Sequence, residues 1–296
     1  MREKVHAIGK HRNLAAIVTE PGNHPRNEQL PAFIILNAGL IHHVGPFRLN
    51  VTLARMIASI GCIACRFDLS GIGDSGPSQD NHSYWKQTVS DIRETMDYIG
   101  AKHGIKEFVL FGACSGADNA HRTAVEDKRV IGAVFVDGYS FPTLRYYLKR
   151  YGRSALSICK WWRLLSRFFA KRLAMGRDAR ESNDLPEGID YTEFPPKNNV
   201  RHELQVLIDR RVELLYFYTG GFSEYYNYQQ QFEDIFPGLD LSERVKVCYL
   251  PAADHTLILQ RDRKQLLDTL SQWTQARFIN NQTTDRAGTR EERRGD

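Results

Sequence analysis

The 296-residue sequence contains no apolar run that approaches the ~20 residues needed to cross a bilayer as a helix. Its first residues, from Met1 to His6, lack the apolar stretch of a secretory signal. Cysteine is scarce, and the five residues are scattered and odd in number, which is typical of reduced thiols rather than a disulfide framework. We therefore expect a cytoplasmic protein without a transmembrane segment.

Metal and nucleic-acid signatures are also missing. Cys62 and Cys65 have the spacing of half a metal or redox site, but no second pair of ligands at such spacing accompanies them. They lie in a strand-like run, so we interpret them as core residues. No nucleic-acid-binding motif accompanies the net charge of +5. The sequence therefore predicts no metal, no cofactor and no nucleic-acid partner.

Charge is concentrated in one segment. Residues 144–177 contain ten basic and no acidic residues, so the rest of the chain carries 5 − 10 = −5. Within it, the run 158–173 has separate apolar and basic stripes at helical spacing, which favours a cap helix with a solvated basic face. We predict a core formed by residues 1–139 and 208–279, a helical cap or lid at 140–207, and a disordered tail at 280–296.

Strands and helices alternate along the chain. Helical periodicity is found at 49–60, 84–100 and 262–278, and a helix-like segment follows residue 117. Apolar runs predict strands at 14–19, 32–36, 63–67, 130–136, 213–218 and 245–250, and another that begins at Phe108. Such repeated units predict an α/β fold with a mostly parallel central sheet, helices on both faces, and functional residues at the carboxyl ends of the strands.

One strand leads directly into Gly112-Ala-Cys-Ser-Gly116, the pattern of a nucleophile elbow. Such a turn lifts its central side chain above the sheet and needs small neighbours because it is crowded. The central residue is Cys114, whose thiolate is a strong nucleophile once a base activates it. A register centred on Ser115 fits less well, because the two glycines flank Cys114 symmetrically. A buried structural cysteine is the alternative interpretation.

Three more segments follow predicted strands: Asn37–Leu40, Asp68–Ser75 and Ala253–Thr256. Together with the elbow, their order and spacing resemble the α/β-hydrolase superfamily over nearly all of residues 10–278. Asp68-Leu-Ser-Gly-Ile-Gly-Asp-Ser75 is similar to the motif that follows the fourth strand in that family. The cysteine at the elbow is similar to dienelactone-hydrolase-like members and to some thioesterases and acyltransferases. The resemblance implies an α/β-hydrolase fold.

The resemblance also implies a catalytic triad. His255 would be the base that takes the proton of Cys114. The family usually draws its acid from the loop after the predicted strand 213–218, where Glu224 is the only carboxylate, so we prefer Glu224. Asp137, which ends the preceding strand, is the alternative acid. Asp254 is expected to point away from the imidazole because adjacent side chains diverge.

The oxyanion hole implied by the resemblance consists of the backbone N–H groups of Ser115 and Leu40. His42 and His43 follow the same loop; they either touch the substrate near the mouth of the site or are simple surface residues.

The expected function is hydrolysis of ester or thioester substrates through a Cys-His-acid triad and a covalent acyl-enzyme. One alternative is an acyltransferase or cyclising thioesterase that passes the acyl group to an amine or alcohol. Another is a non-catalytic binding module on the same fold. The expected partner is a small-molecule acyl ester or thioester, and the basic segment adds coenzyme A or an acyl-carrier protein as further candidates.

Overall fold

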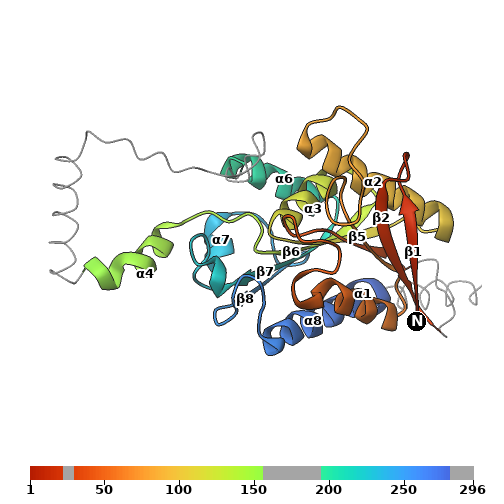
Figure 1. Ribbon diagram of the computed structural model, residues 1–296. Helices are drawn as coiled ribbons and strands as arrows, with labels where there is room; N and C mark the ends of the chain where they lie inside the picture. Colours follow the sequence, from red (N-terminus) through yellow and green to blue (C-terminus); the bar gives the residue numbers. More distant parts are fainter. Residues whose placement is uncertain (23–29, 156–194, 281–296) are drawn as a thin grey trace, which may run out of the picture.

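The computed structural model describes residues 1–22, 30–155 and 195–280. Within them, the strands form one sheet in the order β1-β2-β4-β3-β5-β6-β7-β8 (Figure 1). The strands are β1 (Arg2–Ile8), β2 (Leu14–Glu20), β3 (Ala32–Ile35), β4 (Ala64–Phe67), β5 (Phe108–Ala113), β6 (Val130–Val136), β7 (Glu213–Thr219) and β8 (Val245–Leu250). Neighbours from β4 to β8 are parallel, so the carboxyl ends of β3 to β8 meet at one edge of the sheet.

The first two strands form an antiparallel hairpin whose register pairs Arg2 with Glu20 and Ile8 with Leu14. β2 then pairs antiparallel with β4, which places β1 at the edge of the sheet. The apolar runs predicted β2 at 14–19 but not β1. Three of its seven residues are charged and only Ile8 is buried, so the strand depends on hydrogen bonds to β2 rather than on an apolar pattern.

Helices cover both faces of the sheet (Figure 1). Side chains of β3 alternate between the two layers: Ile34 joins the core under one set of helices, and Phe33 and Ile35 join the core under the other. The first set is α2 (Tyr84–His103), α3 (Ser115–Glu126) and α6 (Lys197–Asp209), and the second is α1 (Leu49–Ser59) and α8 (Gln260–Thr274). This explains why the central strands are continuous apolar runs, and it confirms the predicted α/β architecture.

The described part of the predicted cap consists of α4 (Leu144–Ala155), which projects from the body in Figure 1, and of α6. Val200, Leu204 and Leu207 of α6 are buried in the main core, so this helix covers the sheet. The run 158–173 and residues 281–296 of the predicted tail lie outside the described residues. No helix in the described part of the chain is long and apolar enough to span a membrane.

Candidate active site

The elbow forms where β5 ends and α3 begins. Cys114 is exposed, with φ 54° and ψ −128°, a backbone conformation that is rare for a residue other than glycine. A Cβ on Gly112 would lie 2.0 Å from the carbonyl oxygen of Gly116, and a Cβ on Gly116 would lie 2.3 Å from that of Asn37. Both positions therefore require glycine, and the close approach of backbones holds the thiol above the sheet.

His255 follows β8, and its Nδ1 lies 2.8 Å from Oδ2 of Asp137, which follows β6. Asp137 is buried, and its carboxylate lies where the ends of β6 and β7 meet. The hydrogen bond to Asp137, followed by a hydrogen bond to Cys114, raises the pKa of His255 to about 10, against an opposing effect of burial. The imidazole thus contacts both a carboxylate and a thiol, the arrangement in which a base can hold the thiol proton.

Glu224, the preferred acid, is not part of this arrangement. Its side chain is 75% exposed, and its carboxylate lies 4.0 Å from Nη2 of Arg150 on α4. The 3₁₀ turn η2 (Gly220–Phe222) turns the chain after β7, and Glu224 follows it with an exposed side chain. The geometric expectation for Glu224 is therefore wrong, and the alternative residue Asp137 occupies the position next to His255. The carboxylate of Asp254 accepts hydrogen bonds from the backbone N–H groups of Thr256 and Ile258 rather than from the imidazole.

The loop after β3 approaches the first turn of α3. The N–H of Gly39 donates to Oγ of Ser115 at 2.8 Å, and the N–H of Ile41 closes a turn on the carbonyl of Ala38 at 3.0 Å. The backbone N–H groups of Leu40 and Ser115 make no hydrogen bond within the described residues. Ser115 is the first residue of α3, where the helix dipole favours negative charge. The side chain of Ser115 as an anchor for this loop was not anticipated from the sequence.

Asp68 holds two loops together beside the elbow. Its oxygens accept hydrogen bonds from the side chain of Asn37, the backbone and Nδ1 of His43, and the N–H of Asp74. His43 is buried by this contact, whereas His42 is exposed. Within the described residues, His43, Asp68 and Asp74 are also the one grouping with ligand atoms close enough to share a metal ion. Since the central carboxylate already accepts four hydrogen bonds, the cluster acts as a hydrogen-bonded clamp on the loop after β3.

α3, which begins at the elbow, also carries charged side chains. Asp118 is in the first turn of the helix, and burial raises its pKa to about 7, although the charge of Arg122 acts in the opposite direction. The guanidinium of Arg122 stacks over the ring of Trp85 at 4.3 Å from its centroid. α3 therefore carries a buried acidic group in its first turn and, further along, a basic group that contacts α2.

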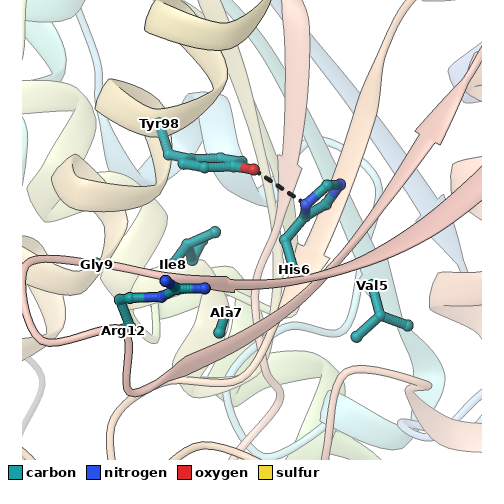
Figure 2. Close-up of a pocket in the computed structure, with 7 residues that line it drawn as sticks. All are labelled: Val5, His6, Ala7, Ile8, Gly9, Arg12 and Tyr98. Carbon is teal, nitrogen blue, oxygen red and sulfur yellow. Dashed lines mark hydrogen bonds between the residues drawn. The ribbon is translucent and has the colours of Figure 1, made fainter.

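A hollow of about 460 Å³ lies elsewhere, against the edge strand β1 (Figure 2). In it, Oη of Tyr98 on α2 lies 3.0 Å from Nδ1 of His6, and burial lowers the pKa of His6. Four strand spacings separate β1 from β5, or roughly 19 Å across the sheet. The hollow is therefore remote from Cys114, and its histidine serves as a contact between β1 and α2.

Neither the protein-family models nor the curated proteins match this sequence. Solved structures do. An α/β serine hydrolase without lid from Xanthomonas campestris has 13% identity and a TM-score of 0.53, and the match covers 94% of this chain and 95% of that one.

Two esterases match similarly. For the esterase domain of a Rhodothermus marinus protein, the identity is 15%, the TM-score 0.54 and the coverage 93% of this chain and 98% of that one. For Est1E from Butyrivibrio proteoclasticus, the identity is 14% and the TM-score 0.52, and the match covers 92% of this chain and 97% of that one. At these identities the similarity concerns the fold, and the chain has the α/β-hydrolase fold that its motifs predicted.

Proposed function

We propose that this protein is an enzyme that cleaves ester or thioester bonds of small-molecule acyl substrates through a covalent acyl-enzyme. The observation that carries the proposal is the position of His255, in contact with both the buried carboxylate of Asp137 and the thiol of Cys114 at the elbow. The names of the structural neighbours, a serine hydrolase and two esterases, support hydrolysis of esters as the reaction class.

In the first half of the reaction, His255 holds the proton of Cys114, and the thiolate attacks the carbonyl carbon of the substrate. The carbonyl electrons move to oxygen, and the N–H groups of Leu40 and Ser115 stabilise the resulting oxyanion. When the carbonyl reforms, the bond to the leaving group breaks, and the leaving group takes the proton from the imidazolium. In the second half, a water molecule gives a proton to His255 and attacks the thioester carbonyl carbon. The C–S bond then breaks, which releases the carboxylic acid and returns Cys114, with the proton shared between its sulfur and His255.

The cysteine nucleophile favours a second candidate reaction. The intermediate on Cys114 is a thioester, which amines attack more readily than they attack an oxygen ester. An amine or alcohol acceptor in place of water would make the protein an acyltransferase or a cyclising thioesterase. Coenzyme A or an acyl-carrier protein would then be the natural acyl donor, and the ten basic residues of 144–177 would attract either of these acidic partners.

The proposal also assigns the parts of the chain. Residues 1–139 and 208–279 hold the catalytic groups, α6 completes the helical layer over the sheet, and α4 belongs to a cap. A free thiol nucleophile must stay reduced, and the cytoplasm keeps thiols reduced. We therefore propose that the protein is cytoplasmic.

Intact-protein mass spectrometry after exposure to p-nitrophenyl acetate and acetyl-coenzyme A tests the function. We expect an acetyl adduct on the wild type that is absent from Cys114→Ala. Cys248→Ala is the matched control, since this half-buried cysteine of β8 is away from the elbow, and it should acylate as the wild type does.

The fate of the adduct separates the candidates. Loss of the adduct in water alone identifies a hydrolase, whereas an adduct that persists in water and disappears with an added amine identifies a transferase. A protein that forms no adduct with either donor and releases no p-nitrophenol or coenzyme A would be a binding module without catalysis, and this result would overturn the proposal. An adduct that survives in Cys114→Ala would move the nucleophile to another residue.

A further inference from the structure

Thr219, the last residue of β7, holds the carboxylate of Asp137 at two points. Its N–H donates to Oδ1 at 2.7 Å, and its hydroxyl donates to Oδ2 at 2.7 Å. His255 Nδ1 shares Oδ2 with that hydroxyl, at 2.8 Å. Thr219 is fully buried, and Asp137 is 3% exposed. The contact between acid and imidazole is thus built on a third residue that neither the expected triad nor the oxyanion loop includes.

The turn that follows Thr219 contacts the histidine from the other side. A Cβ on Gly221 would lie 2.2 Å from the backbone N of His255, and the N–H of Gly221 donates to the carbonyl of Ala253 at 3.0 Å. The ring of Phe222 stacks on the imidazole, with centroids 6.0 Å apart and planes 19° apart. Residues 219–222 therefore contact the acid through Thr219 and the base through Gly221 and Phe222.

We propose that Thr219 is a positioning residue of this site, whose hydroxyl fixes the carboxylate plane of Asp137 so that Oδ2 faces His255. The inference rests on the proposed function, because it assigns Asp137 and His255 to one reaction. Thr219 is completely buried by the surrounding chain, so it acts through Asp137 and not on the substrate.

The physical reason is torsional. Rotation about the terminal bond of an aspartate side chain is soft, because sp³–sp² torsions have broad minima. One hydrogen bond to Oδ1 leaves the carboxylate free to swing about that contact. A second bond to Oδ2 removes this freedom and aligns the lone pair that accepts the imidazole proton. Small losses of alignment in a catalytic group are costly, and a 1 Å displacement can reduce a rate about 100-fold.

The test uses Thr219→Val, which keeps the shape and the backbone N–H but removes the hydroxyl, and Thr219→Ser, which keeps the hydroxyl. Thr95→Val is the matched control: Thr95 is equally buried in α2, and its hydroxyl donates to the carbonyl of Asp91 at 2.8 Å, away from the site. We measure kcat and KM on p-nitrophenyl acetate, the melting temperature, and the downfield proton resonance of His255 Nδ1–H.

For Thr219→Val we expect kcat to fall about tenfold with KM within about twofold of wild type, because the loss of alignment slows the reaction step and leaves binding intact. The Nδ1–H resonance should broaden or exchange faster with solvent. Thr219→Ser should restore both values. Thr95→Val should lower the melting temperature to a similar extent and leave kcat and the resonance unchanged.

Two results would overturn the inference. In the first, Thr219→Val has a kcat within about twofold of wild type and an unchanged Nδ1–H resonance. In the second, Thr219→Ser is as impaired as Thr219→Val, which would make the methyl group rather than the hydroxyl responsible. The resonance does not require turnover. It reports on the hydrogen bonds that join Thr219, Asp137 and His255 even if Cys114→Ala stays active and the proposed function fails. The two failures are therefore distinguishable.

Discussion

Replacing Asp137 with Asn tests the acid most directly, because the change removes the charge and keeps the size. The amide oxygen can still accept the N–H of Thr219, which places the NH₂ group where Oδ2 meets Nδ1 of His255. Nδ1 must then act as the acceptor, so the ring proton moves to the nitrogen that should receive the thiol proton. We expect kcat/KM to fall by about 10² to 10⁴, as for orienting carboxylates in other triads.

The same variant should lower the pKa of His255 from about 10 towards 6.5, because the hydrogen bond to Asp137 is the largest cause of the rise. The raised pKa stabilises the fold fully below the unfolded value near 6.5, and this contribution is lost as the pH rises through about 10. The difference in unfolding free energy between wild type and Asp137→Asn should therefore be largest at acidic pH and shrink between these two values.

Steady-state kinetics and an NMR titration of His255 measure both effects. Glu224→Gln is the control; its exposed side chain makes one distant contact with Arg150, so its rate should stay within about twofold of wild type. A crippled Glu224→Gln beside a nearly normal Asp137→Asn would refute this assignment of the acid. An unchanged His255 titration in Asp137→Asn would refute the electrostatic part of the reasoning.

Three further predictions concern the elbow and its surroundings. Iodoacetamide should modify Cys114 well before Cys62 and Cys65, since burial raises the pKa of both buried thiols to about 12, and peptide mapping after short exposure reads the order. Gly116→Ala should destabilise the protein by about 1–3 kcal/mol in a denaturant melt, because its Cβ would lie 2.3 Å from a carbonyl oxygen. Gly152→Ala, within α4 and with nothing within 4 Å of its Cβ, is the control; it should not destabilise the protein, and equal effects would contradict the argument. Ser115→Ala should reduce kcat about tenfold without abolishing turnover, because it releases the N–H of Gly39 from its anchor; a wild-type rate would remove that role.

The sequence predicted the features that depend on local chemistry. The elbow is recognisable because Gly112 and Gly116 are required by contacts within a few residues of Cys114 and by the backbone next to Asn37. The order of the strands follows from apolar runs that must be buried on both faces. The position of His255 just after the last strand follows from the same alternation. Each of these features is encoded in a short stretch of chain.

The carboxylate that contacts His255 could not be identified in this way. Glu224 and Asp137 both follow strands that end at the same edge of the sheet, and the direction of the turn at 220–222 decides between them. That direction depends on contacts with the loop before His255, which is about thirty residues further along the chain. The anchor between Gly39 and Ser115 was missed for the same reason, because it joins two loops 76 residues apart. A Thr-Gly-Gly-Phe run directly after an apolar strand was the one local signal, and we interpreted it only as the loop that carries the acid.

The order of the strands explains why the contact between Asp137 and His255 requires glycine at positions 220 and 221. Asp137 follows β6 and His255 follows β8, and β7 lies between them. The loop before His255 must therefore cross the end of β7, over roughly 10 Å or two strand spacings, to reach the carboxylate. A Cβ on Gly220 would lie 2.1 Å from the carbonyl oxygen of Pro251, and a Cβ on Gly221 would lie 2.2 Å from the backbone N of His255. A carboxylate on the loop after β7 would contact His255 without this crossing. The two glycines are therefore required because the carboxylate that contacts His255 lies at the end of β6.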